Sequence, residues 1–170
     1  MHHTPCLQSR SFSELCGGPV WLKYENLQRT GSYKIRGALN RVLTLDLEAQ
    51  QRGVIAASAG NHGQGVAVAA QLAGVPATIV MPRQAPLAKV SATRGYGARV
   101  VLVGDVFDEA HAEALCIARR EGLTYVHPFD DPMVMAGQGT VALEILDATP
   151  HLDTLVVPIG GGGLIAGCAT

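Results

Sequence analysis

Short apolar segments alternate with helical segments along most of this sequence, and this alternation is what most constrains its fold. The apolar segments predict strands over residues 20–24, 54–57, 77–81, 99–103, 124–126 and 155–159. Periodic spacing of apolar residues predicts helices over residues 34–45, 61–73, 86–94, 105–121 and 131–146. Strands that alternate with helices form βαβ units, and strands that are apolar throughout are covered on both faces. The pattern therefore predicts an α/β fold with open, twisted, mostly parallel sheets and flanking helices.

The composition excludes several classes of protein. Hydrophobic residues make up 48% of the chain and charged residues 16%, which is too apolar for a disordered protein. The 13 Lys and Arg residues and 14 Asp and Glu residues leave a net charge of −1, without the positive excess of a nucleic-acid binder. The apolar stretch from Leu155 to Ala169 contains Pro158 and a run of glycines, so it is too irregular to cross a bilayer. We expect neither a nucleic-acid partner nor a membrane segment.

The cysteines indicate a reducing compartment. They form no C-x-x-C pair and no metal-ligand spacing, so we expect free thiols and no metal site at Cys6, Cys16, Cys116 and Cys168. Residues 1–7 lack the charged and then apolar pattern of a signal peptide. Together these features favour a cytoplasmic protein.

The first of three loops that can carry chemistry leads into a helix at Lys34. Gly31 permits a turn, and the Ser32 hydroxyl is suited to cap the helix. Free N–H groups in the first helical turn create a positive potential, which would lower the pKa of the Lys34 amine. A neutral amine attacks carbonyl groups to form Schiff bases. Taken alone, however, a single lysine of this kind is more often a solvated surface residue.

The second loop, residues 57–65, follows a strand and opens a helix, at the sheet edge where open α/β folds bind ligands. Small residues at 58–60 allow a ligand to approach the backbone, and N–H groups at the helix start suit a carboxylate. Asn61 adds a side-chain donor and acceptor. The alternative is a plain helix start, with Asn61 as the N-cap and His62 in solvent.

The third loop is the glycine run from Gly160 to Gly163, between an expected strand and a helix. Each glycine costs conformational entropy, and a run of this length exceeds what a turn requires. Backbone N–H groups in such a loop form a cradle for a phosphate. The spacing Gly161-x-Gly163-x-x-Ala166 loosely fits a dinucleotide fingerprint, but that motif usually follows the first strand of a fold. We therefore favour a phosphate over a dinucleotide.

An activated lysine, an amide-bearing loop and a phosphate cradle together meet the needs of pyridoxal phosphate. The sequence resembles the fold-type-II pyridoxal-phosphate enzymes (tryptophan synthase beta-like), and within them the threonine dehydratases, or threonine ammonia-lyases. The motifs that carry this resemblance are Ser32–Ala38, Ser58–Gly65, His127–Pro132, Gly137–Thr140 and Gly160–Leu164. It implies a two-domain architecture with an incomplete large domain. Residues 1–45 would begin the large domain, residues 46–149 would form the small α/β domain, and residues 150–170 would start the large-domain sheet.

The resemblance also implies roles for individual residues. Lys34 would hold the cofactor as a Schiff base, with Tyr33 beside it. Once the substrate has released Lys34 from the cofactor, this lysine would remove the Cα proton. Asn61 would bind the 3′ oxygen of the ring. Backbone N–H groups would bind the phosphate at Gly160, Gly161, Gly162, Gly163 and Leu164. The substrate carboxylate would be held, largely through backbone N–H groups, at Ser58, Ala59, Gly60 and His62.

The implied reaction converts L-threonine to 2-oxobutanoate and ammonia, and L-serine to pyruvate and ammonia. One alternative is a serine or hydroxyaspartate racemase. Racemases of this group carry a second serine where this sequence has Ala59, so we favour elimination. Another alternative is a truncated remnant that binds without catalysis. The resemblance implies a homo-oligomer at full length, and it leaves open a role in isoleucine biosynthesis or in catabolism.

The family's large domain continues beyond the glycine loop. We therefore expect residues 1–170 to be a fragment or a truncated gene product that is poorly stable, or binds cofactor weakly, in isolation. The interpretation also requires the Lys34 side chain and the glycine run to lie together in one shared site. If they lie far apart, the sequence supports only an α/β fold and not the enzymatic interpretation.

Overall fold

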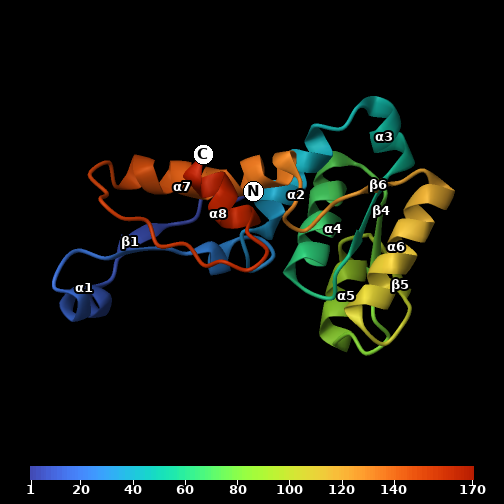
Figure 1. Cartoon of the computed structure of the whole chain (residues 1–170), viewed down its shortest axis with the longest axis horizontal. Helices are drawn as coiled ribbons and strands as arrows, with labels where there is room; N and C mark the ends of the chain where they lie inside the picture. Colours follow the sequence, from blue (N-terminus) through green and yellow to red (C-terminus); the bar gives the residue numbers. More distant parts are fainter.

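The computed structural model describes residues 1–170, which form an elongated molecule with two lobes (Figure 1). One lobe contains a 4-stranded sheet in the order β5-β4-β3-β6, with every neighbouring pair parallel. Its strands are β3 (Val54–Ala57), β4 (Ala77–Met81), β5 (Arg99–Leu102) and β6 (Thr124–Tyr125). The α/β fold with a parallel sheet, predicted from the alternation of segments, is confirmed.

Helices cover both faces of this sheet, which explains why its two central strands, β3 and β4, are almost entirely apolar. On one face, Ala56 and Ile79 belong to a core shared with α4 (Asn61–Ala73) and α5 (Leu87–Gly95). On the other face, Ile55 and Val80 pack against α6 (Phe107–Glu121). Alternate residues of each strand point to opposite faces, so the same short strands supply the side chains that pack against both helical layers.

The second lobe is mainly helical. In Figure 1, α2, α7 and α8 lie beside one another along the long axis, with the N-terminal segment below them. The elements of this lobe are β1 (Cys6–Gln8), α1 (Arg10–Cys16), β2 (Trp21–Lys23), the 3-10 helix η1 (Glu25–Leu27), α2 (Lys34–Leu43), α7 (Pro132–Ala148) and α8 (Gly163–Ala169). A short helix, α3 (Leu47–Arg52), leads from α2 to β3.

Glycines allow the central helices to approach closely. A Cβ atom on Gly37 of α2 would lie 2.5 Å from the carbonyl oxygen of Val134, and one on Gly137 of α7 would lie 2.6 Å from the Cα of Gly37. The crossing of α7 and α8 is equally tight, because a Cβ on Gly139 would overlap the backbone of Gly167. These positions exclude any larger residue unless the helices move apart.

Several elements differ from the sequence prediction. Residues 155–159 form no strand, although they are apolar, because no other strand pairs with them and Pro158 has no N–H to donate. Val156 is 88% exposed and Ile159 is 70% exposed. The segment 20–24 contains the strand β2, but it pairs antiparallel with β1, which the sequence did not predict. The helices α1 and α3 were also missed.

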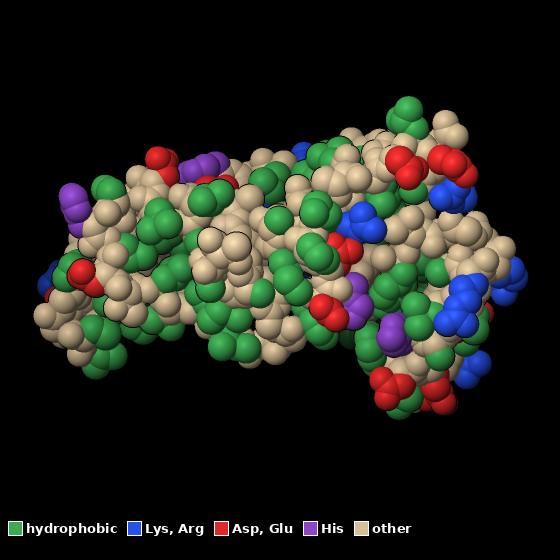
Figure 2. Space-filling model, turned by 45° about the horizontal axis from the view of Figure 1, so that its top comes forward, with side chains coloured by type: hydrophobic (Ala, Val, Ile, Leu, Met, Phe, Trp, Pro, Cys, Tyr) green, Lys and Arg blue, Asp and Glu red, His purple; other side chains and the backbone are tan.

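The predicted division into residues 1–45, 46–149 and 150–170 stays a prediction. Within it, α7 packs against α2 and α8 rather than against the sheet. Apolar side chains lie exposed on the helical lobe, as Figure 2 shows, while Lys and Arg gather mostly over the sheet lobe. No helix in the structure combines the length and the apolar character needed to cross a membrane.

His62 joins α4 to the end of β6. Its side chain is 4% exposed, and its Nε2 lies 2.9 Å from the carbonyl oxygen of Val126, which therefore accepts the Nε2 proton of a neutral ring. Burial lowers the pKa of His62 from 6.5 to about 4, and repulsion from Lys34 and His127 adds to this shift. The alternative interpretation of this loop, with His62 in solvent, is wrong, because the ring turns into the protein toward the sheet.

We expect Gly137→Ala to destabilise the protein by about 2 kcal/mol, since the added Cβ forces α2 and α7 apart. Gly95→Ala is the matched control, because a Cβ at this helical position meets nothing within 4 Å. It should leave stability unchanged or raise it by about 0.5 kcal/mol. Urea unfolding followed by circular dichroism measures both, and equal effects of the two variants would contradict the tight crossing.

We expect His62 to make stability depend on pH between about 7 and 4.5. The unfolded ring titrates near 6.5 and the folded ring near 4, so the unfolded state takes up a proton first and the folded state loses stability as the pH falls. The loss should reach about 2 kcal/mol at pH 4.5. Urea unfolding of His62→Gln should lack this loss, whereas the exposed control His151→Gln should retain it.

Candidate active site

Lys34 is the first residue of α2, and the turn before it prepares its position. Gly31 adopts φ = +72°, a left-handed conformation that favours glycine. The Ser32 hydroxyl accepts the N–H of Lys34 at 3.4 Å, although the N-cap position itself is occupied by Tyr33. Gly65 of α4 packs on this turn, since its Cβ would lie 3.1 Å from the carbonyl carbon of Lys34. The start of α2 is therefore held between its own turn and α4.

The Lys34 amine is half-buried and has one polar partner. Its Nζ donates to the carbonyl oxygen of Pro128 at 2.7 Å and lies 5.4 Å from the centre of the Tyr33 ring. Burial lowers the pKa of Lys34 below its ordinary value of 10.5. The direction agrees with the expectation from the sequence. The cause is the loss of hydration on burial.

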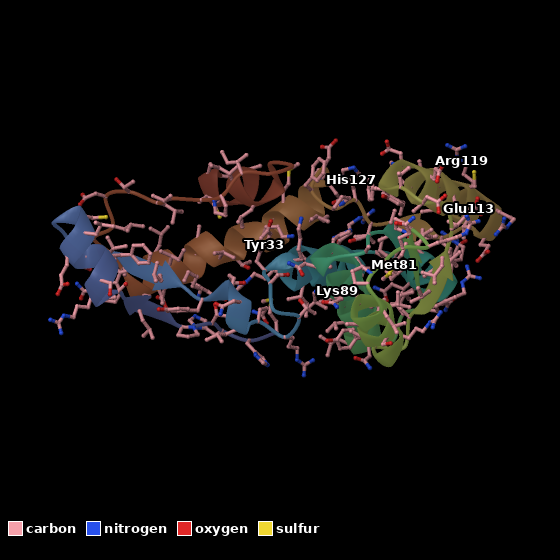
Figure 3. All side chains as sticks on the ribbon, turned by 90° about the horizontal axis from the view of Figure 1, so that it is seen from below. Tyr33, Met81, Lys89, Glu113, Arg119 and His127 are labelled. Carbon is pink, nitrogen blue, oxygen red and sulfur yellow. The ribbon has the colours of Figure 1, made fainter.

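The glycine run lies next to the partner of this lysine. Pro128 is followed by Phe129, and a Cβ on Gly161 would overlap the Phe129 ring. A Cβ on Gly163 would lie 2.8 Å from the Cα of Phe129. Lys34 and the glycine run thus meet at residues 128–129, as the interpretation requires. Figure 3 shows Tyr33 and His127, which flank this region, near the middle of the long axis, where the lobes join.

The glycine run presents unpaired backbone donors. None of the N–H groups from Gly160 to Leu164 donates to an acceptor in the protein. Gly162 adopts φ = +87°, and the Cβ directions of Gly160 and Gly162 point into open space. One pair of glycines therefore packs on Phe129 while the other borders an open volume. Unpaired N–H groups beside such a volume suit a phosphate, so this site fits pyridoxal phosphate.

The loop after β3 presents a second set of free donors. The Ser58 hydroxyl accepts the N–H of Gly60 at 3.1 Å. The N–H groups that donate to no acceptor in the protein are those of Ala59, Asn61, His62 and Gly63. Such groups at the start of α4 suit a carboxylate. Because the His62 ring is buried, that residue can contribute only its backbone N–H here.

Asn61 is exposed, and no group of the protein bonds to its side chain. Gly60 occupies the N-cap position, so Asn61 is the first residue of α4 and not its cap. It lies one turn before Gly65, the residue that packs on the backbone of Lys34. This position leaves the Asn61 amide free to bind a ligand beside Lys34.

His127 lies at the start of the turn that leads into α7. Its Nδ1 accepts the N–H groups of Phe129 at 3.3 Å and Asp130 at 2.7 Å, so the ring carries its proton on Nε2. Its ring meets that of Phe129 edge to face, with centroids 4.7 Å apart. The cap of α7 is Asp131, which accepts from Met133 and Val134. His127 shapes the turn that holds the partner of Lys34.

Two further residues near the site, Gln138 and Arg36, had no individual role predicted from the sequence. Gln138 of α7 accepts the N–H of Gly37 at 3.1 Å. Arg36 of α2 is fully buried and is paired with Glu25 and Glu144. The signal available in the sequence was a charged residue on the apolar face of an expected helix. Sequence alone did not identify its partners, because they lie 11 and 108 residues away.

Comparison with known proteins shows similarity along the whole chain. Residues 1–170 match the family described as pyridoxal-phosphate dependent enzyme. An L-threonine ammonia-lyase of Thermotoga maritima is 57% identical over 167 residues, which are 98% of this chain and 42% of that protein. The chain therefore spans less than half the length of this curated relative.

Solved structures agree with the sequence comparison. The processed form of threonine deaminase isoform 2 from Solanum lycopersicum superposes with a TM-score of 0.96 at 45% identity, over 99% of this chain and 46% of that one. Maize serine racemase superposes with a TM-score of 0.95 at 40% identity, over 99% of this chain and 51% of that one. With a family match over every residue and fold agreement at this level, the chain belongs to the pyridoxal-phosphate-dependent enzymes.

Proposed function

We propose that the protein containing this chain dehydrates and deaminates L-threonine, and also L-serine, with Lys34 as the residue that carries pyridoxal phosphate. One observation carries the proposal: the half-buried Lys34 amine donates to Pro128, next to the residue on which the glycine run packs, and the glycine run and the start of α4 both carry unpaired backbone N–H groups. The similarity to threonine ammonia-lyases supports the choice of reaction.

The two donor sets suit the two anionic groups of the reactants. The free N–H groups of Gly160–Leu164 would hold the cofactor phosphate, and those at the start of α4 would hold the substrate carboxylate. The exposed Asn61 amide would bind the 3′ oxygen of the ring. The half-buried Tyr33 ring lies against the Lys34 amine and would border the cofactor.

The chain's own residues would supply the proton transfer. Bound pyridoxal phosphate provides an electron sink for negative charge at the substrate Cα. The Lys34 amine would take the Cα proton of the substrate, and its lowered pKa increases the fraction of the neutral base. The β-hydroxyl leaves as water, and later hydrolysis consumes one water. L-threonine thus gives 2-oxobutanoate and ammonia without any net change in water.

A racemase is the alternative that the structural comparison favours, since maize serine racemase shares this fold at 40% identity. A racemase must return a proton to Cα from the face opposite to the base that removed it. Ala59 occupies the position expected to carry that acid, and its methyl group has no proton to give. Elimination is the outcome that requires no such group.

We further propose a homo-oligomeric protein in the cytoplasm. The free thiols of Cys6, Cys16, Cys116 and Cys168 support a reducing compartment. Exposed apolar side chains on the helical lobe support burial against further protein, among them Phe12, Leu15 and Val156.

We expect borohydride reduction of the cofactor-loaded gene product to fix the pyridoxyl group on the peptide that contains Lys34. The lysines of this chain are Lys23, Lys34 and Lys89. Lys23 is 5% exposed and paired with Glu144, whereas Lys89 lies on α5 of the sheet lobe (Figure 3). Peptide mapping by mass spectrometry distinguishes them.

Lys34→Ala should abolish the label and the matched control Lys89→Arg should retain it. A label on Lys89, or none on this chain after saturation with cofactor, would remove Lys34 from the proposed role.

We expect L-serine to yield pyruvate and ammonia much faster than D-serine, because no acid faces the base across the cofactor. Chiral chromatography and a keto-acid assay on the same sample measure both products. Ala59→Ser should raise the share of D-serine, since it supplies the missing hydroxyl, whereas Ala88→Ser on α5 should not. D-serine formation by the unaltered protein at a rate that rivals elimination would favour the racemase.

A further inference from the structure

Arg36 lies on α2, two residues after Lys34, and its guanidinium group is fully buried. Its Nε and Nη2 donate to the two carboxylate oxygens of Glu25 at 2.8 and 2.7 Å. Its Nη1 and Nη2 donate to Glu144 at 2.6 and 2.9 Å, and Nη1 also donates to the hydroxyl of Thr140 at 3.1 Å. These bonds use all of the N–H donors of an arginine side chain.

The charges around Arg36 balance. Lys23 donates to Glu144 at 2.5 Å, so two cations meet the carboxylates of Glu25 and Glu144. Burial alone would raise the pKa of Glu144, but hydrogen bonds from Arg36 and Lys23 hold it at about 2. A buried charge group of this kind contributes little net stability, yet losing one member is costly. It is therefore better suited to fixing a geometry than to stabilising the fold.

The geometry that this group fixes is the position of α7 along α2. Glu144 and Thr140 both belong to α7, and Pro128 lies in the turn just before that helix. Gly37 and Asn40 bond to the same helix, at Gln138 and at the carbonyl oxygen of Met133. A shift of α7 against α2 would move the carbonyl of Pro128 away from the Lys34 amine. It would also move Phe129, on which the glycine run packs.

We propose that Arg36 is a positioning residue for Lys34: by bonding α2 to Glu144 and Thr140 of α7, it holds the Lys34 amine against the carbonyl of Pro128 and beside the glycine run. This inference rests on the role proposed for Lys34. Arginine suits this position because its planar guanidinium group binds both carboxylates in a bidentate way, whereas the three donors of a lysine lie on one nitrogen and lack this geometry.

Competitive acetylation of the whole gene product, without cofactor, tests this inference. Mass spectrometry compares the acetylation of Lys34 and Lys89 in the same sample across pH, which yields the pKa of the Lys34 amine with an internal standard. In Arg36→Lys we expect that pKa to rise toward 10.5, because a displaced amine is better hydrated. We also expect the dissociation constant for pyridoxal phosphate to rise about 10- to 100-fold.

Arg99→Lys is the matched control. Arg99 bonds to Thr78 and Glu121 in the sheet lobe, and its replacement should leave both measurements unchanged. If Arg36→Lys does not fold, Glu144→Gln weakens the same link to α7 and should shift both measurements in the same direction, by less.

A folded Arg36→Lys variant with a lower melting temperature but an unchanged Lys34 pKa and cofactor affinity would overturn the inference. Failure of the proposed function has a different signature. In that case the unaltered protein takes up no cofactor at Lys34, while the acetylation profile of Lys34 still depends on Arg36.

Discussion

The close contact between α2 and α7 sets the position of the Lys34 amine relative to the turn before α7. The helices touch where Gly37 and Gly137 face each other, because any side chain at either position would overlap the other backbone. This contact joins residues that lie 100 positions apart in the sequence. It brings the lysine at the start of α2 to the turn that precedes α7. Without it, Lys34 and Pro128 would belong to separate lobes.

Three segments contribute to the candidate site beside this contact. The start of α2 presents an amine, the loop after β3 presents free N–H groups, and the glycine run presents a second set. The loop after β3 lies at the carboxyl edge of a parallel sheet, where backbone donors remain unpaired and ligands of such folds bind. The glycines of the run serve two purposes, since Gly161 and Gly163 pack on Phe129 and Gly160 and Gly162 border open space.

The environment of the Lys34 amine also favours its neutral, reactive form over a fully hydrated ammonium group. Lys34 keeps one polar partner and loses part of its hydration shell, so its neutral form becomes more accessible. Nearby, Arg36 remains fully charged because two carboxylates surround it. The same helix therefore holds one cation destabilised by burial and another stabilised by its partners. The difference lies in the partners, since a carbonyl oxygen compensates a buried charge less well than a carboxylate does.

The local sequence pattern predicted the parallel sheet and its helices well. The spacing of apolar residues and the glycines at helix ends are properties of neighbouring residues. The strands of the sheet were recovered with bounds within one or two residues. The expected strand at 155–159 failed because a strand exists only with a partner, and nothing in the sequence reveals pairing. The buried orientation of the His62 ring was missed for a related reason, since its hydrogen-bond acceptor, the carbonyl oxygen of Val126, is distant in the sequence.

Short-range backbone preferences were enough to predict the fold class, the three loops and the residue types that these loops carry. Which of these groups lie together depends on tertiary contacts. The tertiary structure placed the Lys34 amine at Pro128, left the donors of the glycine run unpaired and enclosed Arg36 between two carboxylates. These outcomes depend on how closely helices approach in space, and that approach is set by contacts between residues far apart in the chain.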